Sequence, residues 1–316
     1  MIRPVSVVIP ALDDRELLAR HLPPLLAELG RRGGKDEVIL VDDTGDDVLA
    51  SWAGERYPGV RCVANASNSG FAAALLAGFE AAGHELVFSM NPDVLVRPGF
   101  LDPLVSCFDA SDVHAAVPRV LLSGESDAIE SLFEIVFEDG EIRLKQPALA
   151  DGDARPGPIQ PTPVPFAIGG TSLFLREPFL ARGGFDPLFG PFYFEDVDLG
   201  WTSWRQGGRT LYQPASVVEH HHRGTISKAV PADLVRAAWE KNRLLFHWKH
   251  LDEPELLRQH LAYLYRFALD AWLGDRREEL VWLALALEQK DAALAARTSA
   301  GPGFSDLCEE LARPRR

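Results

Sequence analysis

Cysteine and methionine are scarce in this chain of 316 residues, which has three cysteines and two methionines. Cys62, Cys107 and Cys308 lie far apart in the sequence, and no CxxC pair is present. Folds that depend on disulfides have closely spaced cysteines and occur in oxidising compartments. We therefore expect no disulfide framework, and a reducing compartment is the natural setting.

Long apolar runs and a leader segment are also lacking. No apolar run reaches the roughly 18 residues that a membrane-spanning helix needs, so the sequence predicts no transmembrane helix. The first residues, Met1-Ile2-Arg3-Pro4, lead directly into a strand-like segment, and we expect no signal peptide. Both absences favour a cytoplasmic protein.

Basic residues are outnumbered, with 32 Lys and Arg against 46 Asp and Glu, a formal net charge of -14 and a pI near 5.1. Proteins that bind nucleic acids need a basic surface to neutralise phosphates, so this balance argues against a nucleic-acid partner. A nucleotide ligand is compatible with it, because one bound metal ion inverts the local field.

Short apolar runs alternate with helical patterns over the first part of the chain. Runs such as Val5-Ser6-Val7-Val8-Ile9 are rich in β-branched residues and apolar throughout, which is typical of strands buried on both faces. Because such alternation forms parallel βαβ units, we expect an α/β fold with helices on both faces of a Rossmann-like sheet. The predicted strands are residues 5–10, 37–43, 60–65 and 85–90, and the predicted helices are residues 16–29 and 71–82.

The middle of the chain is less regular, and we interpret residues 123–165 as a loop insertion. From residue 231 onward the pattern is helical. The elements predicted between these parts, or within the insertion, are a hairpin at residues 135–144, a strand at 172–175, a helix that ends near Gly207, and two short strands at 209–212 and 216–218.

Tryptophan and basic residues are interleaved in the C-terminal helical region. This composition suits a face that lies on a membrane interface, although the same spacing is also typical of core and dimer packing. Three alternatives stay open for these helices: packing on the core, a homodimer contact, or peripheral contact with the inner face of the plasma membrane. The residues concerned are Trp239, Trp248, Trp272 and Trp282 with Lys241, Arg243, Lys249 and Arg266.

Polar residues follow the predicted parallel strands at their carboxyl ends, where ligands of such sheets collect. Asp42-Asp43 can accept hydrogen bonds from a base or ribose, and the alternative is a solvated loop or a helix N-cap. Asn91-Pro92-Asp93 offers a carboxylate to a divalent cation that also binds a diphosphate, or forms an ordinary turn. Asn68-Ser69-Gly70 precedes a helix whose N-terminus attracts phosphate, or is a plain helix start.

Two further clusters carry chemistry. Glu195-Asp196-Val197-Asp198 follows an aromatic run, and one of its carboxylates can act as a general base, with an acid-rich helix start as the alternative. Helical geometry also allows Asp198 to cap the helix while Asp196 faces a cleft. His220-His221-His222 offers imidazole ligands to a metal, but consecutive residues of a strand point in opposite directions, so at most one or two reach the same ion.

In their order along the chain, these elements resemble the family-2 inverting glycosyltransferases of the GT-A fold, particularly the bacterial rhamnosyltransferase-like branch. The resemblance covers roughly residues 4–250. It implies a GT-A domain over residues 1–228, with a nucleotide-binding half at 1–115 and an acceptor and catalytic half at 116–228, and a helical extension over 229–316. The matching stretches are Val5 to Pro10, Val41-Asp42-Asp43, Asn68-Ser69-Gly70-Phe71, Asn91-Pro92-Asp93, Gly183-Gly184-Phe185-Asp186, Glu195-Asp196-Val197-Asp198-Leu199 and the histidine segment before Gly224.

The resemblance implies a role for each matching residue. Asp196 stands where the family has its catalytic base, and Asp93 stands where its metal-binding DxD motif ends. His221 best fits the second metal ligand, and its neighbours His220 and His222 are also candidates. The implied donor contacts are Pro10, Ala11, Asp13, Asp42, Asp43, Asn68, Gly70, Asn91 and Asp93, while Gly169, Gly170, Thr171 and Glu195 line the donor sugar and the acceptor.

The sequence departs from the family pattern at several of these positions. Asn91-Pro92-Asp93 has a single carboxylate at the DxD position, and Ala11-Leu12-Asp13 replaces the aromatic residue and Asn of many relatives. Ala73-Ala74-Leu75 stands where relatives often have an Asn, and the nearest basic residue after the acidic motif is Arg205. These changes bear on the donor's base and sugar more than on the reaction class.

The implied reaction is a single in-line displacement that inverts the anomeric carbon. Asp196 takes the proton of the acceptor hydroxyl. A divalent ion neutralises the departing diphosphate, and we expect Mg²⁺ or Mn²⁺ because carboxylate and diphosphate are hard oxygen ligands. The expected donor is a UDP-, dTDP- or GDP-sugar, and the expected acceptor is a saccharide, a lipid-linked glycan or a small molecule, as in cell-wall or polysaccharide biosynthesis. Nucleotidyl transfer and a non-catalytic nucleotide-sugar-binding module are the alternatives.

Overall fold

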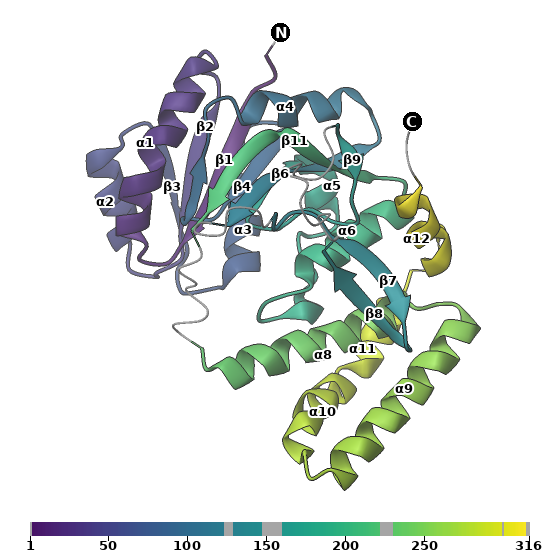
Figure 1. Cartoon of the computed structure of the whole chain (residues 1–316). Helices are drawn as coiled ribbons and strands as arrows, with labels where there is room; N and C mark the ends of the chain where they lie inside the picture. The colour runs from purple at the N-terminus through teal and green to yellow at the C-terminus, as the bar shows by residue number, and fades with distance from the viewer. Residues whose placement is uncertain (1, 123–128, 147–159, 222–229, 299, 314–316) are drawn as a thin grey trace, which may run out of the picture.

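The computed structural model describes residues 2–122, 129–146, 160–221, 230–298 and 300–313. A large mixed sheet with helices on both faces occupies one end of the molecule (Figure 1). The helices of residues 232–295 lie at the other end, and the last helix, of residues 304–312, lies beside the hairpin. A two-stranded hairpin packs between the two parts, beside the C-terminal helices. The predicted α/β fold class is thereby confirmed.

The sheet has the strand order β3-β2-β1-β4-β10-β6-β11-β5, and β9 pairs with β11. Pairing is parallel from β3 to β4, which confirms the βαβ units predicted for this part. Four strands and two helices lie where the sequence predicts them, with their ends shifted by a few residues. The elements up to residue 90 are β1 (Val5–Ala11), α1 (Arg15–Arg31), β2 (Glu37–Asp42), α2 (Val48–Arg56), β3 (Val60–Ala64), α3 (Phe71–Ala81) and β4 (Leu86–Met90).

Alternate side chains of β1 enter two different core layers. Val7 packs in one layer with Leu22 of α1, and Val8 packs in the other with Leu75 of α3. Gly78 lets α3 approach the sheet closely, because a Cβ atom there would lie 2.2 Å from a methyl carbon of Val8. The strand is therefore buried on both faces, as its uninterrupted apolar run predicts.

The second half of the sheet differs from the first in direction. Strand β10 runs antiparallel between β4 and β6, and the long strand β11 then pairs parallel with β6. The elements are β5 (Val94–Val96), α4 (Leu101–Ser106), a 3₁₀ turn η1 (Cys107–Asp109), β6 (Val113–Leu122), β7 (Glu134–Glu138), β8 (Glu141–Lys145), β9 (Thr162–Pro163), β10 (Thr171–Leu175), α5 (Arg176–Ala181), a 3₁₀ turn η2 (Pro187–Phe189), α6 (Glu195–Arg205) and β11 (Arg209–His220).

One prediction for this region is wrong and another is confirmed. Residues 209–212 and 216–218 belong to the single strand β11, not to two strands. Pro214 has no N–H to donate to a ladder, but the chain resumes pairing with the same neighbour after a register shift between Gln213 and Val217. The hairpin predicted at residues 135–144 is formed by β7 and β8.

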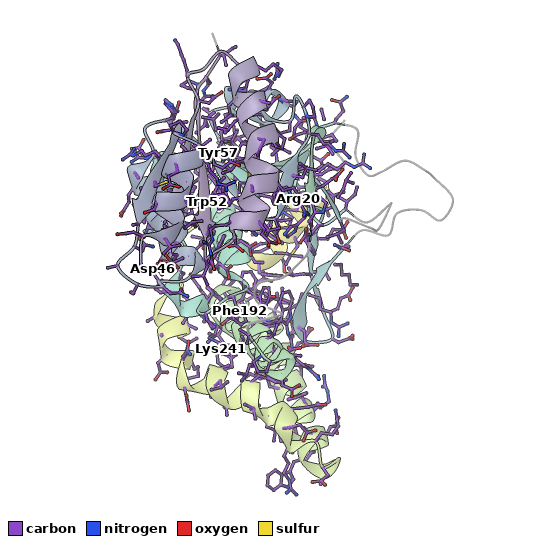
Figure 2. The ribbon with its side chains drawn as sticks, turned by 90° about the vertical axis from the view of Figure 1, so that its left-hand side faces the viewer. Arg20, Asp46, Trp52, Tyr57, Phe192 and Lys241 are labelled. Atoms are coloured by element: carbon purple, nitrogen blue, oxygen red, sulfur yellow. The ribbon has the colours of Figure 1, made fainter. Side chains whose placement is uncertain are left out.

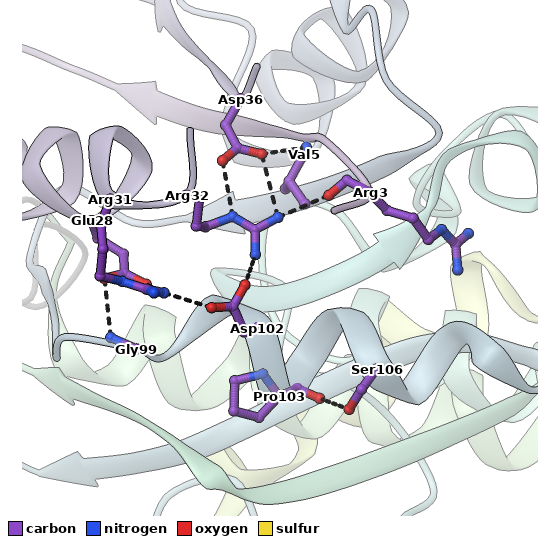
Figure 3. A network of polar contacts seen from close by, with 10 residues as sticks. All are labelled: Arg3, Val5, Glu28, Arg31, Arg32, Asp36, Gly99, Asp102, Pro103 and Ser106. Atoms are coloured by element: carbon purple, nitrogen blue, oxygen red, sulfur yellow. Dashed lines mark hydrogen bonds and ion pairs between the residues drawn. The ribbon is translucent and has the colours of Figure 1, made fainter. Parts of the chain in front are cut away.

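A buried arginine fixes the end of α1 against the sheet (Figure 3). The Arg32 guanidinium contacts Asp36, Asp102 and the Arg3 carbonyl, and Asp36 in turn accepts a hydrogen bond from the Val5 N–H. The Arg32 and Asp36 side chains are each 1% exposed. A planar guanidinium has donors in several directions, so one side chain joins α1, β1 and α4 at this point.

The C-terminal region is helical, as predicted. Trp248, Trp282, Lys241 and Lys249 are buried, whereas Trp239, Trp272 and Arg266 are exposed. Part of the predicted set therefore packs in the core, and contact with a membrane or a second copy stays a prediction. Among the described residues, no helix is both long enough and apolar enough to cross a membrane. The elements are α8 (Ala232–His250), α9 (Pro254–Leu273), a 3₁₀ turn η3 (Arg277–Leu280), α10 (Val281–Glu288), α11 (Lys290–Ala295) and α12 (Phe304–Ala312).

Candidate active site

Pairing between two strands brings Asp93 to the histidine segment. Strand β5 begins directly after Asp93 and runs antiparallel to β11, with Val94 opposite His220. The His221 N–H donates to the Asp93 carbonyl over 2.9 Å. These residues are far apart in the sequence, and the sheet register alone makes them neighbours. His222, the third candidate of the triplet, lies outside the described residues.

His220 lies between two carboxylates. Its Nδ1 atom is 2.7 Å from Glu130, and its Nε2 atom is 3.2 Å from Asp93. Burial by itself would lower the pKa of His220, but the two carboxylates outweigh burial and raise that pKa to about 10. Glu130 was not among the predicted site residues, because it lies in the irregular segment that offers no periodic pattern.

His21 of α1 is a second residue that the sequence did not indicate. Its Nδ1 atom lies 2.7 Å from the Pro92 carbonyl, and since a carbonyl only accepts, Nδ1 carries the proton. The His21 ring stacks on that of His221 at 5.5 Å between centroids. Burial, assisted by the neighbouring His221, lowers the pKa of His21 and favours a neutral ring. The local sequence did not indicate His21, because it looks like any other polar residue of an amphipathic helix.

The potential metal ligands around Asp93 are few, and they fit an ion that takes most of its ligands from phosphate and water. The Nε2 atoms of His21 and His221 are buried and have no hydrogen-bond partner among the described residues. The described residues contain no group of three metal-binding side chains around one point. Mg²⁺ and similar hard ions commonly bind one or two protein ligands and complete their shell with phosphate and water, so Asp93 with one imidazole suffices.

A pair of glycines connects the Asp93 loop with Asp196. The Gly170 carbonyl accepts from the Asn91 N–H over 2.7 Å, and the Gly169 N–H donates to Asp196 Oδ2 over 3.2 Å. A Cβ atom on Gly170 would lie 2.4 Å from the Asn91 side chain, so only glycine fits against this residue. Two consecutive residues thus contact both the predicted metal loop and the predicted base.

Asp196 and Glu195 begin α6 and are enclosed by protein on most sides. Burial raises the pKa of Asp196 to about 6, although hydrogen bonds from the Gly169 and Val197 N–H groups oppose the rise. Burial and the adjacent Asp196 raise the pKa of Glu195 to about 8. A carboxylate whose pKa is raised toward neutrality is suited to accept a proton from a hydroxyl group.

The prediction that Asp198 caps α6 is wrong. Phe194 takes the N-cap position, and Asp198 is buried on the other side of the helix. Its carboxylate lies 2.8 Å from Lys249 Nζ and 2.7 Å from His250 Nε2, both on α8. The acid-rich helix start therefore contains one carboxylate beside the glycine pair and one that anchors the C-terminal helices.

Asp42 and Asp43 are engaged within the chain. Asp42 is fully buried, and its carboxylate accepts from the Thr44 and Ala50 N–H groups. Asp43 accepts from the Ser69 and Gly70 N–H groups and from the Asn65 and Ser69 side chains, which closes the loop before α3. Their predicted contacts with the base and ribose stay predictions, and Asp42 would have to give up internal hydrogen bonds to make them.

The remaining donor-side candidates lie along the same edge of the sheet. Pro10 and Ala11 end β1 and are buried, whereas Asp13 is exposed and pairs with Arg15 over 2.7 Å. The exposed Asn68 accepts from the Gly70 N–H over 3.0 Å. Thr171 begins β10 with a buried hydroxyl that has no hydrogen-bond partner among the described residues. The roles predicted for these residues stay predictions.

The sheet, with a carboxylate loop at its edge next to an acidic helix start, has the arrangement of the GT-A fold of glycosyltransferases. A model of glycosyl transferase family 2 matches residues 6–182, which is more than half of the chain. The chain therefore belongs to glycosyl transferase family 2, as its sequence motifs indicate.

Two proteins of Mycobacterium tuberculosis are similar in sequence. One is an N-acetylglucosaminyl-diphospho-decaprenol L-rhamnosyltransferase, 27% identical over 260 residues, which cover 72% of this chain and 79% of the relative. The other is a pre-mycofactocin glycosyltransferase, 27% identical over 226 residues, which cover 70% of this chain. The chain spans only 43% of the length of this second relative.

Solved structures share the fold. GalNAc-T7, in a complex with UDP, GalNAc and Mn²⁺, superposes with a TM-score of 0.62 at 18% identity and covers 85% of this chain and 57% of its own. The mannosyltransferase PcManGT of Pyrobaculum calidifontis, in a complex with GDP-Man and Mn²⁺, has a TM-score of 0.52 at 19% identity and covers 94% of this chain and 86% of its own.

Proposed function

We propose that this glycosyltransferase moves a sugar from a nucleoside-diphosphate donor to a hydroxyl acceptor with inversion, and that Asp196 is its general base. The single observation that carries the proposal is the hydrogen-bonded path from the Asn91 N–H through Gly170 and Gly169 to the Asp196 carboxylate. The path is short, and it supports the proposal that the Asp93 loop and Asp196 border one cleft. An in-line displacement needs the diphosphate and the base on opposite sides of one anomeric carbon.

Asp196 is proposed to hold the acceptor hydroxyl and to take its proton as the oxygen attacks the anomeric carbon. Its pKa of about 6 leaves it ionised at neutral pH but basic enough to accept a proton. Glu195, whose pKa is raised to about 8, is protonated at the same pH and can donate a hydrogen bond to the acceptor. One base and no covalent sugar intermediate give inversion.

The proposed cofactor is Mn²⁺ or Mg²⁺, held by Asp93 and an imidazole of the adjoining histidines. Such an ion neutralises the charge that develops on the diphosphate leaving group. Both structural relatives named above are Mn²⁺ complexes with a nucleotide or a nucleotide sugar. His221 remains the preferred second ligand, because the carboxylates of Asp93 and Glu130 already hold His220.

The acceptor class is proposed from a relative. A protein similar over 79% of its length is an L-rhamnosyltransferase that acts on N-acetylglucosaminyl-diphospho-decaprenol. We therefore propose a lipid-linked saccharide as the first acceptor class to test, with a UDP-, dTDP- or GDP-sugar as donor and a setting at the cytoplasmic face of the plasma membrane. For the C-terminal helices, we propose homodimer formation and membrane contact as two alternatives, without a preference between them.

The test begins with binding. A thermal-shift screen of UDP-, dTDP- and GDP-sugars, each with and without Mn²⁺, identifies the donor, since ligands that bind the folded state raise the unfolding midpoint. Turnover is then followed with a short-chain prenyl-diphospho-N-acetylglucosamine acceptor, and NMR of the product reports the anomeric configuration. We expect release of nucleoside diphosphate, an inverted linkage and a requirement for the metal.

The Asp196→Asn variant separates the proposal from its rivals. We expect it to bind donor like the wild type but to lose about 10²- to 10⁴-fold in turnover, as removal of a general base does. Release of pyrophosphate in place of nucleoside diphosphate would indicate nucleotidyl transfer. A wild-type protein that binds donor but transfers to no acceptor would support the non-catalytic module.

A further inference from the structure

The backbone turn directly before Glu195 and Asp196 is in an unfavourable conformation. Tyr193 and Phe194 both have φ of 72°, which places two consecutive non-glycine residues in the left-handed region. A Cβ atom is crowded by the neighbouring carbonyl there, so such residues persist only where the surrounding structure holds them. Phe194 is also the N-cap of α6, and therefore this turn sets the position and direction of the helix that carries Asp196.

The contacts that hold the turn come from α8, in the C-terminal helical region. Asn242 is fully buried, and its Nδ2 atom lies 2.6, 2.9 and 2.8 Å from the carbonyl oxygens of Phe189, Phe192 and Tyr193. The adjacent Lys241 donates from Nζ to the Gly190 carbonyl over 2.8 Å. Figure 2 shows Phe192 and Lys241 next to each other where the C-terminal helices meet the rest of the protein.

These carbonyls have a particular need for a side-chain donor. They belong to a loop, so no neighbouring strand supplies N–H groups, and a buried carbonyl without a partner costs free energy. One amide nitrogen that reaches three of them fixes the loop from Phe189 to Tyr193 as a unit. Because a carbonyl cannot accept from an oxygen without a hydrogen, the orientation of the Asn242 amide is also determined.

A second set of contacts holds α6 from the same helix. Lys249 Nζ lies 2.7 Å from Asp186 and 2.8 Å from Asp198, and His250 lies 2.7 Å from Asp198. Asp186 precedes the loop and Asp198 follows the turn. Helix α8 therefore contacts the segment at both ends and in its middle.

We infer that Asn242 is a positioning residue for the reaction: by holding the left-handed turn at Tyr193 and Phe194, it aims the Asp196 carboxylate at the Gly169 N–H and the acceptor. The inference rests on the proposed role of Asp196 as the base. The sequence predicts that the catalytic domain ends at residue 228 and that a helical extension follows. In this inference α8, which belongs to that extension, positions a group of the catalytic domain.

The test compares Asn242→Asp with Phe108→Ala. The first variant keeps the side-chain shape but replaces the amide donor with a carboxylate. The second removes a buried ring of η1 that packs with Leu104 and Val113, in a core cluster that does not contain the turn. Two quantities are measured in the full-length protein: hydrogen–deuterium exchange of residues 189–198, and kcat and donor KM separately. Misplacement of a catalytic group by about 1 Å lowers rates by about 10²-fold.

We expect Asn242→Asp to speed exchange of residues 189–198 by about tenfold or more and to lower kcat by about 10²-fold, with donor KM within about threefold of the wild type. Phe108→Ala should lower the melting temperature but leave both quantities unchanged. If Asn242→Asp does not fold, Asn242→Ser, which keeps one donor, serves in its place with intermediate effects.

The role of Asn242 would be overturned if residues 189–198 of Asn242→Asp exchanged hydrogen at the wild-type rate, or if its kcat were unchanged. A loss of kcat of the same size in Phe108→Ala would overturn it as well, because general destabilisation would then explain the effect. Absence of transfer by the wild-type protein counts against the proposed function instead, and the exchange comparison still decides whether Asn242 holds the turn.

Discussion

His220 Nε2 lies 3.2 Å from Asp93 Oδ1, and this contact joins the two ends of the candidate metal site. Burial would lower the pKa of His220, but Asp93 and Glu130 raise it to about 10. This imidazole therefore carries a proton at neutral pH. A protonated imidazole is no metal ligand, so a cation that binds Asp93 competes with His220 for the carboxylate. The Nε2 atom of His221, by contrast, is buried without a hydrogen-bond partner among the described residues and lies 3.7 Å from Glu219 Oε2.

Metal affinity should distinguish the two histidines. We expect His221→Gln to weaken Mn²⁺ binding at pH 7 by about tenfold or more, and His220→Gln to leave it equal or tighter. Free Mn²⁺ is measured by electron paramagnetic resonance during titration of the protein in the presence of donor. Asp93→Asn is the positive control for lost affinity, and Asp109→Asn, an exposed acid outside the site, controls for net charge. Weaker binding in His220→Gln alone would reverse the assignment.

The stability of Asp196→Asn should depend on pH. Because burial raises the folded-state pKa of Asp196 to about 6, the folded protein binds this proton more tightly than the unfolded chain, whose pKa is about 3.9. Its contribution to stability is complete below pH 4 and is lost as the pH rises through 6. Removing the carboxylate should therefore raise the free energy of unfolding by about 1–3 kcal/mol at pH 8, and by little at pH 4. Urea denaturation at the two pH values measures this difference.

Asp198→Asn is the matched control on the same helix. Burial would raise the pKa of Asp198, but its contacts with His250 and Lys249 outweigh burial and lower that pKa. Its contribution to stability is present above the unfolded pKa and disappears as the pH falls, so the sign is opposite to that of Asp196. We expect Asp198→Asn to be less stable than the wild type at pH 8. Equal effects of both substitutions would show that the environment of Asp196 does not penalise its charge.

The pH dependence of the reaction should reflect the same group. If Asp196 is the base, kcat/KM with donor, acceptor and saturating metal should rise with pH and be half-maximal near its pKa of about 6. An ordinary aspartate titrates near 3.9, so the acidic limb is displaced upward by roughly two pH units. Initial rates between about pH 4.5 and 8.5 measure the limb. A constant kcat/KM over that interval would contradict the assignment.

Substitution of Gly170 should damage the site without unfolding the protein. A methyl group there would lie 2.4 Å from the Asn91 side chain, which must move to make room two residues before Asp93. We expect Gly170→Ala to weaken donor and Mn²⁺ binding by about tenfold or more, measured by calorimetry. Gly54→Ala is the control, because nothing lies within 4 Å of its Cβ position in α2; it should raise stability slightly and leave binding unchanged. If Gly170→Ala bound donor and Mn²⁺ like the wild type, Gly169 and Gly170 would have no part in the donor and metal site.

Arg32 should be the arginine whose loss most affects folding. Arg32→Ala removes the partner of Asp36, whose side chain is 1% exposed, and a buried charge left without its partner costs about 3 kcal/mol or more. Arg258→Ala is the control, since its pair with Glu255 has side chains 75% and 55% exposed, and the change should be about 0.5 kcal/mol or less. Chemical denaturation measures both. A loss below about 1 kcal/mol for Arg32→Ala would show that water solvates Asp36 in the variant.

Much of the fold follows from local sequence. Val5-Ser6-Val7-Val8-Ile9 and the other apolar runs predict buried parallel strands because both faces of each strand need apolar partners. The carboxyl ends of such strands lie at one edge, which is why the sequence predicts that Asn91 and Asp93 lie near a ligand. Local pattern does not reveal pairing partners, so β11, interrupted at Pro214, appears in the sequence as two strands.

The sequence by itself determined the family, the sheet of the first half and the residues from which a site must be built. Only the tertiary structure decided which way each of them faces. Asp196 and Asp198 have nearly the same neighbours in sequence, but two residues turn a helix by about 200°, so one carboxylate reaches the Gly169 N–H and the other reaches Lys249. His21, Glu130 and Asn242 join the site from distant parts of the chain for the same reason: their partners are set by packing between elements, which no local pattern encodes.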